Sequence, residues 1–278
     1  MPRPSLKFVE SKDDSFHINF KFIRPLYNEK HSTTYVCEDL RTHKMVVIKE
    51  NTTHPYYYQL LREINILQKL KHDGIIKMLD YHIIDERNKA YIILEYIEKG
   101  DLYEYFEKCT PYFTEGNVIE IIRQLINSIT YCHANGVCHR DIKLENILLN
   151  HDNSIKLIDF GLSVQKTGTT FIMSGQCGSP DYMAPEVLSD EYTVYDEKCD
   201  VWSIGVVLYI LTYKQFPFEY KNIPSLKHNV AHDDIVPPSN IKPSDDVVDL
   251  LGKMLCKDPS SRISITEASE HVCFAYAI

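Results

Sequence analysis

Three short polar motifs follow one another in the middle of the chain and limit its possible folds more than any other feature. They read HRDIKLEN at residues 139–146, DFG at residues 159–161 and APE at residues 184–186. At about 5% usage per residue type, the four fixed residues of the first motif arise by chance roughly once in 10⁵ positions. Turn formation explains a single Asp or Asn beside a hairpin, but it does not explain three motifs in this order.

The hydrophobic pattern changes near residues 96–101, which predicts two structurally different parts. Strand-like runs lie at residues 33–37, 45–48, 75–84 and 91–96. One helix interrupts them after Pro55, with Leu60, Ile64, Leu67 and Leu70 at helical spacing. Helices are predicted later around residues 118–129 and at 197–213, 245–256 and 265–271, and a hairpin joins 147–149 to 155–158. A strand-rich part therefore precedes a helix-rich part, after a loosely packed leader at residues 1–20.

Composition excludes several classes of protein. The formal net charge is −9, so the chain has no global attraction for nucleic acid or anionic membranes. The cysteines form no CxxC pair, which removes support for a zinc site. The longest apolar run, residues 201–213, is too short to span a bilayer and suits a buried helix. We expect a monomer that binds neither nucleic acid nor membrane. Its thiols are expected to be reduced, as in the cytoplasm, and the nucleus is an alternative location.

The three motifs resemble the catalytic-loop, DFG and APE signatures of the protein kinase family, serine/threonine type. The resemblance covers roughly residues 21–274, nearly the whole chain. It implies an α+β bilobal kinase fold, with a strand-rich N-lobe at about 21–97 carrying one key helix and a larger helical C-lobe at about 98–274. The segments at residues 178–187 and 198–203 are most similar to the calmodulin-dependent and AMP-activated kinase group.

The resemblance also implies roles for the motif residues. Asp141 would accept the proton of the attacking hydroxyl, and Lys143 would neutralise charge on the migrating phosphoryl group. Asn146 and Asp159 are hard oxygen donors that would hold Mg²⁺, or Mn²⁺ as an alternative, beside ATP.

Further residues match the family's nucleotide site. Lys49 matches the strand lysine that holds the α- and β-phosphates, and Glu63 would pair with it. Residues 94–97 would form the hinge that reads adenine. Asp101 fits a ribose or substrate contact, or a helix cap. The remaining expected contacts to nucleotide are Val47, Glu95, Ile97, Glu145 and Leu148.

One segment departs from the family pattern. The family's glycine-rich loop reads GxGxxGxV, whereas its equivalent here, residues 27–34, contains no glycine. Glycine lets the backbone approach the phosphates closely, and Glu29 brings a negative charge towards them. We therefore expect weak ATP binding. The residues assigned to this loop are Leu26, Tyr27, Asn28, Glu29, Ser32 and Thr34.

Specificity and regulation can also be predicted. Lys143 and Ser179 favour serine or threonine substrates, because Ser179 would hydrogen-bond both Asp141 and Lys143. Asp101 and Glu145 lie where basophilic relatives meet arginine upstream of the phosphosite. Arg140 would await a phosphate on the activation segment, residues 159–186, but the usual acceptor position is Gly175. The segment offers the hydroxyls of Thr167, Thr169, Thr170 and Ser174, of which Ser174 is the first candidate phosphate acceptor and Thr170 the second. The alternative is a segment that is ordered without phosphate.

Other matches support the fold, and a rival function stays open. Glu186 and Arg262 match a buried ion pair, and Asp200 and Trp202 match the central helix that braces the catalytic loop. The rival function is a pseudokinase that acts as a scaffold or binding module, and only the loop without glycine supports it.

Overall fold

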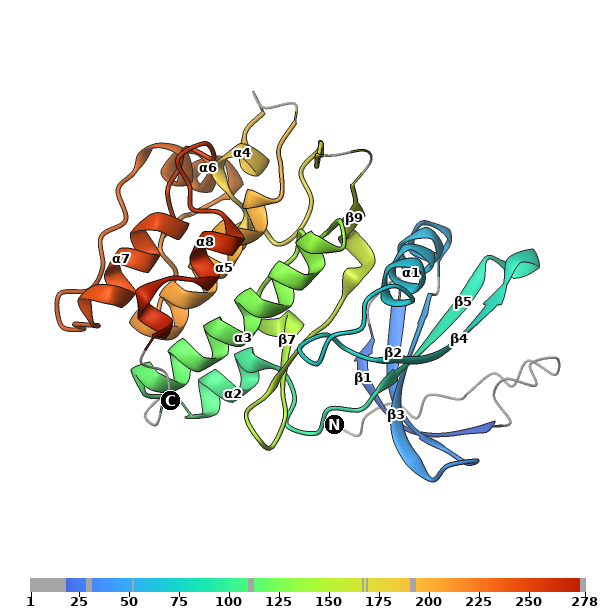
Figure 1. The fold of residues 1–278 in the computed structure, drawn as a ribbon. Helices are drawn as coiled ribbons and strands as arrows, with labels where there is room; N and C mark the ends of the chain where they lie inside the picture. Colours follow the sequence, from blue (N-terminus) through green and yellow to red (C-terminus); the bar gives the residue numbers. More distant parts are fainter. Residues whose placement is uncertain are drawn as a thin grey trace. The chain divides into compact units, whose positions relative to one another are not determined.

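The computed structural model describes residues 19–28, 32–51, 53–109, 113–166, 168, 170–190 and 194–275. Contacts divide the chain into two units, one made of residues 1–60 and 78–96 and the other of residues 61–77 and 97–278. Figure 1 shows the elements of each unit. The predicted leader at residues 1–20 lies outside the described residues up to residue 18.

The first unit contains one antiparallel sheet (Figure 1). Its strands are β1 (Phe20–Asn28), β2 (Ser32–Asp39), β3 (Lys44–Asn51), β4 (Met78–Ile84) and β5 (Lys89–Glu95), in the order β1-β2-β3-β5-β4. The predicted strands at 33–37, 45–48 and 91–96 are thus found in β2, β3 and β5. A 3-10 turn at Asp85–Arg87 connects β4 to β5, and Asn88 ends it in the left-handed conformation.

The two faces of this sheet differ in character. Val46 and Ile48 of β3 join a buried hydrophobic cluster that also contains Phe20, Cys37, Tyr91 and Ile93. Side chains alternate along a strand, so Val47 and Lys49 lie on the opposite face. Thr34 pairs with Lys49, and Val47 pairs with Leu94.

Two expectations for the first third of the chain were wrong in their boundaries. The strand predicted at 75–84 begins only at Met78, because Ile75 forms a bridge with Leu157 and the Ile76 N–H donates to Leu157 O at 3.0 Å. Helix α1 spans His54–Leu67, so Leu70 lies beyond it. Strand β1 was not predicted, because Pro25 and two register shifts against β2 interrupt the alternating pattern.

The second unit is mainly helical (Figure 1). The boundary between the units falls within α1, whose last residues belong to the second unit. The other helices of this unit are α2 (Leu102–Cys109), α3 (Glu115–Ala134), α4 (Pro185–Leu188), α5 (Lys198–Tyr213), α6 (Ile223–His232), α7 (Asp245–Met254) and α8 (Ile265–Ser269). The predicted buried helix at 197–213 is confirmed in α5, whose residues are buried almost throughout. Among the described residues, none of the helices has the length and hydropathy needed to cross a membrane.

Local sequence signals explain most helix ends. Thr114 and Asn117 form a capping box at the start of α3, and Asn135 caps its end. Helices α7 and α8 end two residues before their predicted ends. Helix α6 was not predicted, although a capping box between Asn222 and Ser225 marks its start.

Two short ribbons flank the first two sequence motifs. β6 (Val137–Cys138) pairs with β9 (Val164–Gln165), and the predicted hairpin appears as β7 (Ile147–Leu149) paired with β8 (Ile155–Leu157). The first motif lies between β6 and β7, and the DFG motif lies between β8 and β9. Short 3-10 turns follow at Leu144–Asn146, Phe160–Leu162, Pro180–Tyr182 and Val272–Phe274.

Candidate active site

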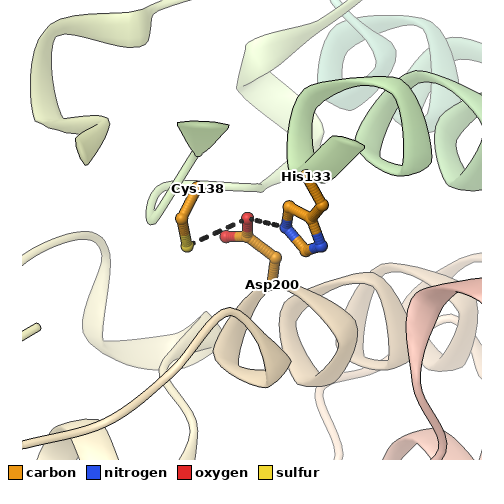
Figure 2. A group of neighbouring side chains, drawn as sticks. All are labelled: His133, Cys138 and Asp200. Atoms are coloured by element: carbon orange, nitrogen blue, oxygen red, sulfur yellow. Dashed lines mark hydrogen bonds and ion pairs between the residues drawn. The ribbon is translucent and has the colours of Figure 1, made fainter. Parts of the chain in front are cut away.

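Asp200, in the first turn of α5, fixes the backbone of the catalytic loop. Its carboxylate accepts hydrogen bonds from the backbone N–H of His139 and of Arg140, both at 2.8 Å. His133 Nε2 lies 2.9 Å from Oδ2, and the Cys138 thiol donates to the same oxygen at 3.2 Å (Figure 2). The predicted bracing role of Asp200 is therefore confirmed.

The charge of Asp200 is maintained despite full burial. Burial alone raises the pKa of a carboxyl group, but the His133 hydrogen bond and charge and the Arg140 N–H outweigh it. The net effect is a pKa below the ordinary value. Asp200 thus stays an acceptor for the loop at neutral pH.

His133, Cys138 and Asp200 lie close enough to resemble a metal-binding group, as Figure 2 shows. The contacts argue against that role. Both Asp200 oxygens already accept backbone N–H groups. Burial also raises the pKa of Cys138 well above its ordinary range, and metals bind the thiolate form. The group therefore serves to hold the loop.

Asp141 is the centre of the candidate active site. It is buried, and Asn146 Nδ2 donates to its backbone oxygen at 2.8 Å and to Oδ2 at 3.1 Å. Lys143 Nζ lies 3.0 Å from Oδ2. The Ser179 N–H and hydroxyl donate to Oδ1 at 2.9 and 3.0 Å. The second unit thus brings together three residues of the first motif and Ser179, which precedes the APE motif.

Ser179 also connects the catalytic loop to the segment that precedes the APE motif. Its Oγ accepts a hydrogen bond from Lys143 Nζ at 2.8 Å, so the predicted double contact is confirmed. Gly178 adopts a φ of +107°, and a Cβ there would lie 2.5 Å from the Arg140 carbonyl oxygen. Only glycine permits this approach.

A backbone hydrogen bond links the chain at Asn146 to the chain just before Asp159. The Ile158 N–H donates to Asn146 O at 2.9 Å, which links the residue before Asp159 to the catalytic loop. Because Asn146 directs Nδ2 to Asp141, its Oδ1 is the oxygen that the amide can offer to another group. Asp159 has a left-handed backbone and is half-buried.

The predicted buried ion pair is also confirmed. Arg262 donates from NH1 and NH2 to the two oxygens of Glu186 at 2.7 and 2.9 Å, and both side chains are buried. Arg262 NH1 further donates to Lys198 O at 2.9 Å. These bonds tie the APE motif to α5.

The residues expected to contact nucleotide belong to both units. In the first unit, Thr34, Val47 and Lys49 share one sheet face, Leu26 is half-buried and Tyr27 is exposed. Ser32 begins β2 and Glu95 ends β5. Glu29 and the side chain of Asn28 lie outside the described parts of the chain.

In the second unit, Glu63 and Ile97 are buried, Leu148 is half-buried and Glu145 is exposed. Asp101 caps α2, because its Oδ1 accepts from the Glu104 N–H at 2.8 Å. The pairing of Lys49 with Glu63 and the contacts to nucleotide stay predictions.

Sequence reasoning missed several residues that support the site. The His139 ring packs against Phe160 with 4.8 Å between ring centroids, and its Nε2 lies 3.0 Å from Ile158 O. His133 and Tyr195 likewise bond to Asp200 and Arg140. His133 and Tyr195 are each a single residue in an ordinary helix or loop, so no local pattern marks them, whereas His139 lies in the first motif and only its contacts were missed.

Comparison with known proteins agrees with this geometry. The sequence profile described as "Protein kinase domain" matches residues 28–274. The chain therefore belongs to the protein kinase family.

Several curated relatives are more than 30% identical to the chain. The SNF1-related protein kinase catalytic subunit alpha KIN12 of Arabidopsis thaliana is 38% identical over 77% of this chain and 42% of its own length. The CBL-interacting protein kinase 26 of Oryza sativa subsp. japonica is 37% identical over 80% and 44%. The probable serine/threonine-protein kinase MARK-B of Dictyostelium discoideum is 36% identical over 77% and 30%. The chain thus spans less than half the length of these relatives.

Proposed function

We propose that this chain transfers the γ-phosphate of ATP to serine or threonine hydroxyls of protein substrates. The observation that carries the proposal is the arrangement around Asp141. Its carboxylate is held by Asn146 and Ser179, and a lysine ammonium lies 3.0 Å away. Relatives such as MARK-B are named as probable serine/threonine-protein kinases, which supports the same class of substrate.

The residues of the chain have distinct roles in this reaction. Asp141 orients the substrate hydroxyl and accepts its proton, because one carboxylate oxygen is fixed by Ser179 and the other by Asn146. Lys143 balances negative charge on the transferred phosphoryl group. Ser179 joins these two groups, which supports an acceptor hydroxyl on a short side chain.

The donor atoms also fit a divalent cation. Asn146 Oδ1 and the Asp159 carboxylate are hard oxygen ligands of the type that Mg²⁺ prefers, and Mn²⁺ accepts the same set. When bound, the ion neutralises charge on the phosphates of ATP. Lys49 is assigned to the α- and β-phosphates by its match to the family's strand lysine. The basis for this assignment is the chemistry of these side chains and the family match.

Substrates with a basic residue upstream of the phosphosite fit the charges near Asp141. Glu145 is exposed, two residues beyond Lys143. Asp101 is buried and engaged as the cap of α2. Glu145 is therefore the better placed of the two predicted acidic contacts.

A peptide-library assay tests the proposed activity. The purified protein is incubated with labelled ATP, Mg²⁺ or Mn²⁺, and matched peptides that differ only in a central Ser, Thr or Tyr. We expect label on Ser and Thr peptides, and loss of label with Asp141→Asn. Nucleotide binding without transfer in any condition would instead favour the pseudokinase alternative.

A further inference from the structure

Arg140, the residue before Asp141, has partners on three segments of the second unit. Its backbone N–H donates to Asp200 Oδ1 at 2.8 Å, in α5. Its Nε donates to Leu162 O at 2.8 Å, just after the DFG motif. Its NH1 donates to the Tyr195 hydroxyl at 3.2 Å. The guanidinium is thus engaged by neutral oxygen acceptors from two directions.

Tyr195 also contacts the activation segment. Its hydroxyl donates to Gly175 O at 3.1 Å while it accepts from Arg140. Burial, followed by the neighbouring Cys177, raises the pKa of Tyr195, so the hydroxyl stays protonated and remains a donor at neutral pH. Two backbone hydrogen bonds between Tyr195 and Met173, at 2.8 and 3.0 Å, fix its position.

The same stretch of the segment is held by further contacts. Gln176 Nε2 donates to Leu188 O at 3.0 Å. Gly178 packs against the Arg140 carbonyl oxygen, and Ser179 bonds to Asp141. Residues 173–179 are therefore connected to the catalytic loop through Tyr195 at one end and through Gly178 and Ser179 at the other.

We propose that Tyr195 is a positioning residue that holds Arg140 and residues 173–179 in the arrangement needed for phosphoryl transfer, without phosphorylation of the activation segment. This inference rests on the proposed kinase function. The Tyr195 hydroxyl takes the place of an acceptor phosphate, because it connects Arg140 to Gly175, the position where that acceptor is expected.

A phosphate on Ser174 is not required in this arrangement. The Ser174 side chain is exposed. Arg140 already has Tyr195 and Leu162 as acceptors, so a phosphoserine would have to displace them. The sequence-based expectation of a Ser174 switch and the Tyr195 bridge therefore predict opposite results for dephosphorylated protein.

The first experiment uses phosphatase-treated full chain, shown by mass spectrometry to carry no phosphate at residues 159–186. We expect it to keep at least half of its kcat, and Ser174→Ala to behave like the wild type. Tyr195→Phe should lower kcat about 10-fold, which corresponds to about 1.4 kcal/mol. The KM for ATP should stay within about 2-fold. A role in stability alone would not separate kcat from KM in this way.

A rescue experiment distinguishes positioning from general destabilisation. Gly175 has a φ of +79° and open space where a Cβ would lie. Asp tolerates this left-handed conformation better than most residues and would give Arg140 a carboxylate partner. The double variant Tyr195→Phe/Gly175→Asp should recover most of the lost kcat. Tyr213→Phe, which removes the hydroxyl of another buried tyrosine, should leave kcat unchanged.

Two outcomes would overturn the inference: an inactive dephosphorylated wild type that is reactivated by phosphate on Ser174, or Tyr195→Phe with wild-type kcat. Absence of transfer in every form of the protein, phosphorylated or not, would instead overturn the proposed kinase function.

Discussion

The hydroxyl of Ser179 lies 3.0 Å from Asp141 Oδ1, although the two residues are 38 positions apart in the sequence. The Ser179 N–H reaches the same oxygen at 2.9 Å. This oxygen is therefore engaged by the segment before the APE motif, whereas Oδ2 is contacted by Asn146 and Lys143. Catalysis and the placement of that segment are thereby coupled through one carboxylate.

The first prediction is that Asp141→Asn abolishes transfer without unfolding the chain. The amide keeps the size of the side chain but cannot accept the proton of the attacking hydroxyl. We expect kcat to fall by several orders of magnitude. The circular dichroism spectrum and the melting temperature should not change, which would show that the variant is folded. Transfer at a rate near that of the wild type would show that Asp141 is not the base.

The second prediction concerns the loop without glycine. Tyr27 is 53% exposed at the end of β1, and Ser32 begins β2. Because side chains replace glycine here, we expect a KM for ATP towards or above the upper end of the usual range of about 1 μM to 1 mM. Replacing Tyr27, Glu29 and Ser32 together with glycine should lower that KM.

Two controls accompany this loop variant. Glu29→Gln alone separates the effect of charge from that of shape. Tyr81→Gly introduces glycine in place of another exposed tyrosine of the same sheet and should leave KM unchanged. A tight wild-type KM that the triple variant does not alter would show that the loop functions without glycine.

The sequence was informative where several residues act together. The first motif and the segment before the APE motif predicted the cluster of Asp141, Lys143, Asn146 and Ser179, because the spacing of these residues is itself a signal. The apolar run at residues 201–213 predicted a buried helix for a similar reason, since α5 is surrounded on all sides.

Single residues and irregular strands were not predictable in the same way. Strand β1 is interrupted by Pro25 and by register shifts, so alternation is lost. The contact of Tyr195 with Arg140 joins residues 55 positions apart, and nothing in the local sequence of either residue requires it. Such contacts arise from the tertiary fold, which a local pattern does not encode.

The third prediction concerns the buried pair of Arg262 and Glu186, whose side chains are 0% and 3% exposed. Arg262→Met would leave the Glu186 carboxylate buried without its partner, which costs about 3–5 kcal/mol in such pairs. We expect a loss of this size in the free energy of unfolding measured by urea denaturation. Lys108→Met breaks an exposed pair with Glu104 and should cost less than about 1 kcal/mol. Equal losses in the two variants would contradict the assigned role of burial.

The fourth prediction is a pH dependence that comes from Asp200. Its pKa is lowered in the folded state, so below the ordinary value of 3.8 the unfolded chain binds more protons than the folded one. The stabilisation from Asp200 is therefore complete above that value and is lost as the pH falls through the folded-state pKa. Asp200→Asn should destabilise the protein at neutral pH, and its difference from the wild type should shrink in acid.

Urea denaturation from about pH 7 down to the acid transition measures this difference. Asp245→Asn is the matched control, because Asp245 is an exposed carboxylate in the first turn of α7. It should cost much less than Asp200→Asn at neutral pH, because the Asp245 side chain is exposed. A difference between Asp200→Asn and the wild type that stays constant in acid would show that the charge of Asp200 does not contribute.

The last prediction concerns the substrate sequence. Burial and, after it, the charge of Glu145 raise the pKa of Tyr182, which indicates that the exposed Glu145 carboxylate acts close to the segment that follows Ser179. An arginine two or three residues before the phosphosite would form a charge-assisted hydrogen bond with Glu145. We expect peptides with Arg or Lys there to be preferred, and Glu145→Gln to reduce that preference about 10-fold in kcat/KM.

Asp101→Asn is the comparison, because asparagine keeps the cap of α2 while removing the charge. It should change the preference less than Glu145→Gln does. A peptide library without basic enrichment upstream of the phosphosite would rule out this recognition.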